Sequence, residues 1–116
     1  DEDRMSKACI IMTTVGSEEQ AISIAEELVH KKLSACVNII PAVRSIYFWK
    51  DEVCNDEELL LIIKSVPEKF EEIHATIGEL HSYDLPECIS LDLNEGCPEY
   101  LDWIIRTVTS PEEATD

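Results

Sequence analysis

The stretch of sequence that decides the fold is S-A-C-V-N-I-I-P-A-V-R-S-I-Y-F-W at residues 34–49, followed by V-C-N-D-E-E-L-L-L-I-I-K-S-V at residues 53–66. Both segments are rich in the β-branched and aromatic residues that favour strands. The first is too long for one ordinary straight strand, and Pro41 cannot donate a hydrogen bond to a sheet, so we expect a bend at Pro41. Residues 50–52, K-D-E, form a polar break. The two segments therefore predict an extended β-hairpin.

The residues before the hairpin predict a strand and then a helix. Residues 7–14, K-A-C-I-I-M-T-T, form an apolar run without polar alternation, which is typical of a central strand covered on both faces. Ser17 followed by Gln20 indicates a capping box at the start of a helix. The helix is expected to end near Lys31 and Lys32. Its apolar residues recur at helical spacing, at Ala21, Ile24, Ala25 and Leu28.

The residues after the hairpin predict a helix, a strand and a last helix. Pro67 suits the first position of a helix that ends near His81. Residues 88–93 alternate between apolar and polar side chains, which indicates a short strand with its apolar residues on one face. Pro98 opens the last helix, whose apolar positions are Leu101, Ile104, Ile105 and Val108.

The predicted order of elements is βαββαβ with an additional C-terminal helix. This order predicts the α+β, ferredoxin-like arrangement, in which helices cover one face of an antiparallel sheet. We expect one domain over residues 1–116, with a core at 7–109 and frayed acidic ends at 1–3 and 110–116. The hairpin is longer than a helix-covered sheet of this size can use. A neighbouring subunit is therefore expected to cover its outer part, which carries Tyr47, Phe48 and Trp49.

Composition excludes several classes of function. A formal net charge of −16 disfavours nucleic acid and anionic membrane surfaces. The longest apolar runs are far shorter than the roughly 20 residues that a membrane helix needs. Five cysteines without a C-x-x-C pair fit neither a disulfide framework nor a zinc ribbon, which indicates a reducing compartment. The first residues, D-E-D-R, do not have the pattern of a secretory or organelle leader, so we predict a cytoplasmic location.

Four motifs follow one another along the chain, A-C-V-N-I-I-P at 35–41, S-I-Y-F-W-K at 45–50, L-L-I-I-K-S at 60–65 and Y-L-D-W at 100–103. Through these motifs the sequence resembles the CutA divalent-cation tolerance family. This resemblance implies a ferredoxin-like subunit in a homotrimer, where the long hairpin of one subunit extends the sheets of its neighbours. It also implies a role in tolerance of, and response to, divalent metal ions, with copper binding.

The chain departs from the family pattern near the expected metal ligands. H-S-Y-D at residues 81–84 replaces the usual His-Pro-Tyr-Glu, and Asp51 replaces the usual glycine of the hairpin turn. Members linked to copper carry a cysteine and a His-His pair at the places that hold Thr13, Leu80 and His81 here. One of those three ligands, His81, is therefore retained.

His81 and Asp84 are the candidate metal ligands. Imidazole together with a nearby carboxylate suits Cu²⁺ or Zn²⁺, and Tyr83 and Glu87 lie in the same segment. Alternatively, His81 caps the second helix, where an imidazolium meets the negative end of the helix dipole. His74 lies about 10 Å from His81 along that helix, which is too far for the two to share one ion.

Aromatic and basic residues are the candidates for a subunit interface or cleft. We expect Lys64 and Arg44 to pair with carboxylates such as Glu58 or Asp92 at subunit contacts. The aromatic residues either anchor the packing of subunits or line a cleft for a small ligand. The candidates for this interface or cleft are Tyr47, Trp49, Lys64, Tyr83 and Trp103.

The sequence does not predict an enzyme. Cys97, between a glycine and Pro98 at a helix start, is the best candidate nucleophile, yet the geometry of a capping turn explains the segment without chemistry. With three glycines the chain has no phosphate-binding loop, so we expect no organic cofactor. We predict a homotrimer that binds divalent metal. The alternatives are a trimeric small-ligand sensor similar to the PII proteins and a scaffold for assembly of a partner protein.

Overall fold

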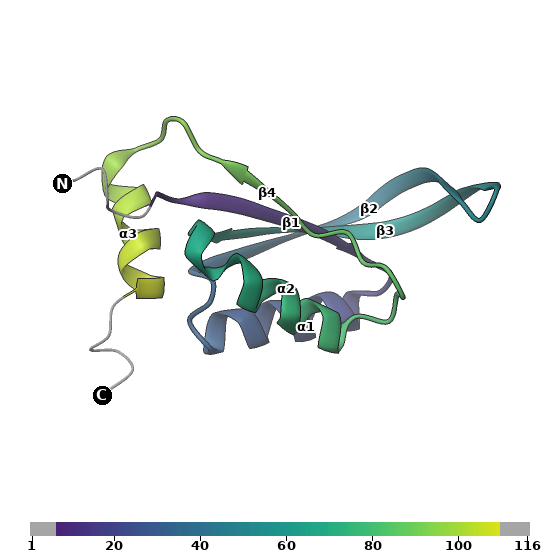
Figure 1. Ribbon diagram of the computed structural model, residues 1–116, viewed down its shortest axis with the longest axis horizontal. Helices are drawn as coiled ribbons and strands as arrows, with labels where there is room; N and C mark the ends of the chain where they lie inside the picture. The colour runs from purple at the N-terminus through teal and green to yellow at the C-terminus, as the bar shows by residue number, and fades with distance from the viewer. Residues whose placement is uncertain (1–6, 110–116) are drawn as a thin grey trace.

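The computed structural model describes residues 7–109, and the predicted frayed ends at 1–3 and 110–116 lie outside the described residues. Figure 1 shows a sheet with helices beneath it and the C-terminal helix at one end. The elements, in chain order, are β1 (Cys9–Val15), α1 (Glu18–His30), β2 (Cys36–Trp49), β3 (Glu52–Ser65), the 3₁₀ turn η2 (Pro67–Lys69), α2 (Phe70–Leu80), β4 (Ile89–Asp92) and α3 (Pro98–Thr109).

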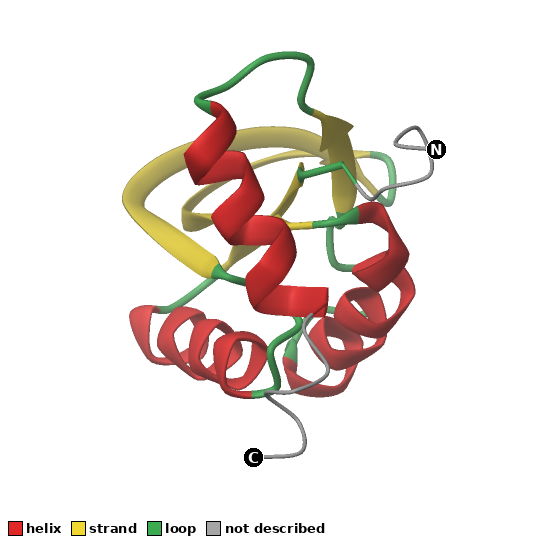
Figure 2. Cartoon of the chain, turned by 90° about the vertical axis from the view of Figure 1, so that its left-hand side faces the viewer, coloured by secondary structure: helices red, strands yellow, loops and turns green. Residues whose placement is uncertain are grey.

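The sheet has the strand order β2-β3-β1-β4, and every neighbouring pair of strands is antiparallel. Helices α1 and α2 lie side by side on one face of it (Figures 1 and 2). This is the ferredoxin-like βαββαβ arrangement with an extended hairpin and a C-terminal helix, so the predicted fold class is confirmed.

Strand β1 lies at the centre of the sheet but has two different faces. Cys9, Ile11 and Val15 are fully buried, whereas the alternate residues Ile10 and Met12 are half-buried. The prediction of a strand covered on both faces is therefore wrong for the single chain, because helices cover one face alone. The fully buried core under those helices also includes Ala21, Ile24, Leu28, Leu61, Ile63, Ile73 and Ile77.

The β2–β3 hairpin projects beyond the rest of the molecule (Figure 1). Its pairing is irregular between Ile40 and Val43, where Ala42 has a φ of 62°, which confirms the predicted bend at Pro41. At the tip, Lys50 and Asp51 have φ values of 52° and 66°. Two consecutive left-handed residues form the tight turn whose twist matches that of paired strands.

The helix starts follow the sequence signals with one difference. The Ser17 hydroxyl accepts a hydrogen bond from the Gln20 backbone N–H over 3.1 Å, as a helix cap should. However, the buried Oε1 of Gln20 has no hydrogen-bond partner, so the reciprocal bond of the predicted capping box is absent. Pro67 starts the turn η2 that leads into α2, as predicted.

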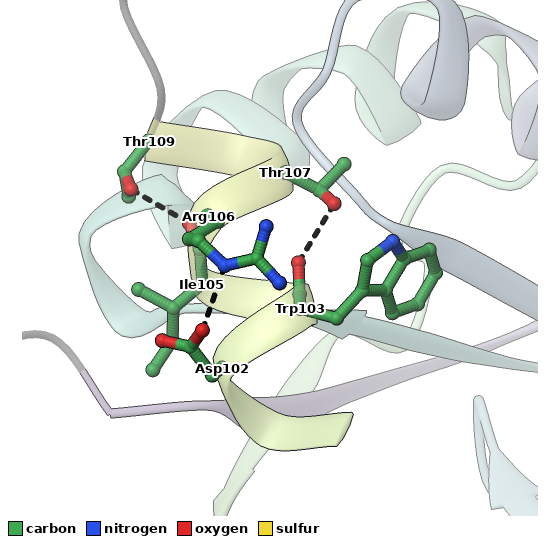
Figure 3. Close-up of polar contacts among 6 residues, drawn as sticks. All are labelled: Asp102, Trp103, Ile105, Arg106, Thr107 and Thr109. Atoms are coloured by element: carbon green, nitrogen blue, oxygen red, sulfur yellow. Dashed lines mark hydrogen bonds and ion pairs between the residues drawn. The ribbon is translucent and has the colours of Figure 1, made fainter. Parts of the chain in front are cut away.

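Helix α3 lies at the end of the sheet remote from the hairpin tip (Figure 1). Its inner face buries Ile104 and Val108. On an exposed face, Nε of Arg106 donates to Oδ2 of Asp102 over 2.7 Å, one helical turn away. Figure 3 shows the Trp103 ring pointing away from this ion pair. Helix α3 thus packs on the sheet end and still leaves Trp103 38% exposed.

Candidate ligand pocket beside the hairpin

A pocket of about 750 Å³ lies where the hairpin meets the end of β1 and the loop between α2 and β4. This volume is in the range of small-molecule sites in proteins. Aromatic, aliphatic and acidic side chains share the lining with one cationic side chain. The lining residues are Thr14, Arg44, Ser45, Ile46, Tyr47, Trp49, Glu58, Tyr83, Asp84, Leu85, Pro86 and Glu87.

His81 attaches the α2–β4 loop to the central strand. Its Nε2 donates to the backbone carbonyl of Thr14 over 2.7 Å, and its Nδ1 accepts from the backbone N–H of Tyr83 over 3.1 Å. One donating and one accepting nitrogen define a neutral imidazole. The ring therefore does not act as the cationic helix cap considered above; the cap at this end is the backbone N–H of His81, which donates to Ile77 over 2.8 Å.

The two candidate metal ligands have different environments. His81 is 9% exposed, its ring nitrogens both have hydrogen-bond partners, and it is not among the residues that line the pocket. Asp84 is exposed and lines the pocket. Among residues 7–109, no three His, Cys, Asp or Glu side chains come together as a metal site. A cation bound by His81 would have to break one of its two hydrogen bonds.

Two tyrosine–carboxylate pairs line the pocket. The hydroxyl of Tyr83 donates to Oε2 of Glu58 over 2.6 Å, and the hydroxyl of Tyr47 donates to Oδ2 of Asp56. Burial, followed by the hydrogen bond to Glu58, raises the pKa of Tyr83 well above its ordinary value. The hydrogen bond to Asp56 raises the pKa of Tyr47 to about 12. Both phenols therefore stay neutral hydrogen-bond donors at physiological pH.

The predicted interface and cleft residues fall into two separate groups. Tyr47, Trp49 and Tyr83 line the pocket together. Lys64 lies instead beside α3, where its Nζ donates to the hydroxyl of Tyr100 over 3.2 Å. The Tyr100 ring in turn lies 5.5 Å from that of Trp103. The structure therefore separates Lys64 and Trp103 from the pocket.

Within the chain, the two basic residues contact groups other than the carboxylates that we expect them to meet at subunit contacts. Lys64 bonds to a phenol and not to Glu58 or Asp92, because alternation places Lys64 and Asp92 on opposite faces of the sheet. Arg44 donates to Asn55 over 3.2 Å and lies 4.0 Å from Glu57. The strand register sets Arg44 directly opposite Glu57, which decides this pairing.

Two of the five cysteines are in surroundings that disfavour the thiolate. Burial raises the pKa of the Cys9 and Cys88 thiols. Cys97 is exposed, and its carbonyl accepts from the backbone N–H of Leu101 over 3.0 Å, so it is the capping residue of α3. This position agrees with the structural interpretation of Cys97.

Sequence reasoning missed Glu58 as a member of the site. It is 5% exposed, it lines the pocket, and it accepts the hydrogen bond from Tyr83. One signal was available: Glu58 directly precedes the apolar run L-L-L-I-I at 59–63. A carboxylate at the edge of a buried strand requires a specific partner.

The protein is of the α+β, ferredoxin-like class, with an extended hairpin, the C-terminal helix α3 and a ligand-sized pocket beside the hairpin. The family described as "CutA1 divalent ion tolerance protein" matches residues 9–107. The chain belongs to this family, and the recognition made from its motifs is confirmed.

Relatives from bacteria, archaea and plants share most of the chain. A divalent-cation tolerance protein CutA of Thermus thermophilus is 45% identical over 82% of this chain and 92% of its own length. One of Archaeoglobus fulgidus is 39% identical over 84% of this chain and 95% of its own length. The chloroplastic CutA of Arabidopsis thaliana is 38% identical over 82% of this chain, which spans 52% of that relative.

Solved structures of CutA1 proteins have the same fold. That of Oryza sativa superposes with a TM-score of 0.87 at 32% identity, over 91% of this chain and 97% of its own. That of Thermus thermophilus has a TM-score of 0.84 at 43% identity, over 86% and 97% of the two chains. A structure from Archaeoglobus fulgidus, with a TM-score of 0.84 at 38% identity over 87% of this chain and 98% of its own, is described as periplasmic. Within residues 7–109 no helix is long and apolar enough to cross a membrane.

Proposed function

We propose that the protein is a cytoplasmic, non-enzymatic homotrimer that binds divalent metal, copper foremost, in the tolerance of and response to metal ions. Membership of the CutA1 divalent ion tolerance family supports the metal role. The observation that carries the trimer is the exposed apolar hairpin, where Ile46, Phe48 and Val53 are 65%, 69% and 72% exposed. Apolar side chains clustered on one projecting element mark a protein contact.

The geometry of the hairpin supports a closed assembly of identical chains. Phe48 and Val53 lie opposite each other near the tip, so each hairpin presents an apolar surface at its end. Strand β4 is a free sheet edge whose four residues are all exposed. An exposed edge and a projecting hairpin on one chain suit a cyclic arrangement in which each copy covers the next.

The metal ligands that we propose are His81 and Asp84. The two residues are three positions apart in the α2–β4 loop, and Asp84 offers an exposed carboxylate. His81 becomes a ligand when one of its hydrogen bonds, to Thr14 or from Tyr83, opens. Binding that must break a hydrogen bond is weakened by about the net value of that bond, 0.5–1.5 kcal/mol, so we expect modest affinity.

Two measurements test this proposal. Light scattering should give three times the chain mass of 13.1 kDa. Calorimetric titration of chelator-treated protein with Cu²⁺ and with Zn²⁺ should show micromolar binding in the wild type. His81→Ala and Asp84→Asn should each weaken it at least tenfold, whereas His30→Ala, which removes an exposed histidine on α1, should leave it unchanged. Equal affinities in all four proteins would remove His81 and Asp84 from the site.

A further inference from the structure

We propose that the pocket beside the hairpin binds a small organic ammonium ion, with Glu58 as its counter-charge and the rings of Tyr47, Trp49 and Tyr83 around its apolar body. This inference goes beyond metal tolerance, and it does not depend on the ligands proposed for the metal.

The first argument is the buried carboxylate of Glu58. Its side chain is 5% exposed and lines the pocket, and its described hydrogen bond comes from a neutral phenol, Tyr83. No ion pair to Glu58 occurs among the described residues 7–109. A buried carboxylate is costly unless a cation and hydrogen bonds compensate its charge. A ligand ammonium in the pocket would supply that cation.

The second argument is the sign of the charge around the pocket. Glu58, Asp84 and Glu87 line it, against one cationic side chain, Arg44. Arg44 already donates to Asn55 and lies 4.0 Å from Glu57. The lining is therefore net negative, on a protein whose formal net charge is −16. Such a pocket attracts cations and repels the phosphates and carboxylates of anionic metabolites.

The third argument is the aromatic and aliphatic lining. Ammonium groups bind over the faces of tryptophan and tyrosine rings, and such contacts contribute about 0.5–2 kcal/mol. The Nζ of Lys50 lies 5.9 Å from the ring centroid of Trp49, which shows that this ring can pair with an ammonium group. Leu85 lines the pocket and adds exposed apolar surface at 70%. The pocket thus combines a counter-charge, aromatic rings and room for a hydrocarbon body.

The apolar lining of the pocket and its single buried carboxylate determine which class of ligand fits. A bare divalent metal would use the oxygen ligands but not the rings. An organic monoammonium ion uses both, since its charge meets Glu58 while its carbon skeleton covers the apolar lining. A volume of about 750 Å³ exceeds that of a single ammonium group, which favours an amine with an aromatic or alkyl body.

The test uses three probes of one shape and different charge. Benzylammonium, benzyl alcohol and benzoate are titrated into the chelator-treated wild-type protein, and binding is followed by saturation-transfer NMR and calorimetry. We expect benzylammonium to bind at least tenfold more tightly than benzyl alcohol, and benzoate not to bind. Glu58→Gln should reduce benzylammonium affinity at least tenfold and leave benzyl alcohol unchanged. Glu26→Gln, an equal loss of charge at an exposed position on α1, should have no effect.

Each contrary outcome is decisive because circular dichroism and light scattering first verify that every variant keeps its fold and mass. Equal affinity for benzylammonium and benzyl alcohol would overturn the proposal, as would an unchanged affinity in Glu58→Gln. Absence of benzylammonium binding would overturn it as well. The chelator removes metal from every titration, so these results do not depend on metal binding. The metal-tolerance proposal is tested separately by its own titration.

Discussion

Tyr83 donates a 2.6 Å hydrogen bond to Glu58, and this bond joins the loop after α2 to the base of the projecting hairpin. The two residues are 25 positions apart in the sequence. The loop has a second attachment, from His81 to the carbonyl of Thr14. The loop that borders the pocket is therefore fixed at two points to two different strands.

Removing the phenol of Tyr83 should destabilise the protein. Tyr83→Phe leaves the buried carboxylate of Glu58 without its hydrogen-bond donor, which typically costs about 1–3 kcal/mol. Tyr47→Phe removes the comparable bond to the exposed Asp56 and should change the free energy of unfolding by less than about 0.5 kcal/mol. Urea unfolding at one fixed chain concentration measures both, since assembly couples stability to concentration. Equal losses in the two variants would contradict a special role for Glu58.

The core hydroxyl of Thr13 offers a stabilising substitution. Thr13 is fully buried on β1, and its Oγ1 has no hydrogen-bond partner. Thr13→Val keeps the shape and removes the unsatisfied hydroxyl, so it should raise the free energy of unfolding by about 1 kcal/mol. The matched control is Ser65→Ala, because that buried hydroxyl donates to the Leu33 carbonyl over 2.6 Å. Its loss should lower stability; a destabilised Thr13→Val would show that its hydroxyl is satisfied in the folded protein.

The hairpin tip offers a second stabilising substitution. Asp51 has a φ of 66°, a left-handed conformation that glycine adopts without the steric cost of a Cβ. Asp51→Gly should raise the thermal midpoint by a few degrees, equivalent to about 0.5–1 kcal/mol. Glu52→Gly, at the first residue of β3, should lower it, because glycine loses more conformational freedom on folding than any other residue. Differential scanning calorimetry would compare the two, and parallel changes would refute the assignment of strain to the turn.

The alkaline titration of the tyrosines should depend on their carboxylate partners. Because the folded-state pKa of Tyr47 and Tyr83 is raised above 10, their contribution to stability is complete below pH 10 and is lost as pH rises through the folded-state values. Tyrosinate absorbance near 295 nm should show Tyr47 ionising with a midpoint of about 12. Glu58→Gln should lower the pH midpoint at which Tyr83 ionises and leave the midpoint of Tyr47 nearly unchanged. An unchanged Tyr83 midpoint would contradict the coupling.

The fold could be predicted because its signals are local. The apolar spacing in α1, the position of Pro67 and the bend at Pro41 each depend on residues within a few positions of one another, and each is confirmed. The predicted cover on both faces of β1 failed because an apolar strand sequence does not show whether the second face is covered by the same chain. Ile10 and Met12 remain half-buried here.

The site could be predicted in part. Tyr47, Trp49 and Tyr83 were grouped from the sequence and do meet at one pocket. The contacts that Lys64 and Arg44 make within the chain could not be predicted, because strand register and the docking of α3 decide them and neither is encoded locally. His81 was predicted as a ligand or a cap, whereas its bond to Thr14 spans 67 positions and depends on tertiary structure. Contacts between residues so far apart in the sequence produce no local sequence pattern from which they could be predicted.

The irregularity between Ile40 and Val43 sets the phase of the outer hairpin. Two residues of β2, Pro41 and Ala42, lie opposite a single residue of β3. On β2, the odd-numbered residues after this bulge therefore lie on the same face as the even-numbered residues before it. Tyr47 and Trp49 thereby come to the same side as Glu58. A regular ladder through the same residues, without the bulge, would instead bring Ile46 and Phe48 to that side and remove the phenol and indole groups from the pocket wall. The one extra residue of β2 therefore decides which side chains of the outer hairpin face the pocket.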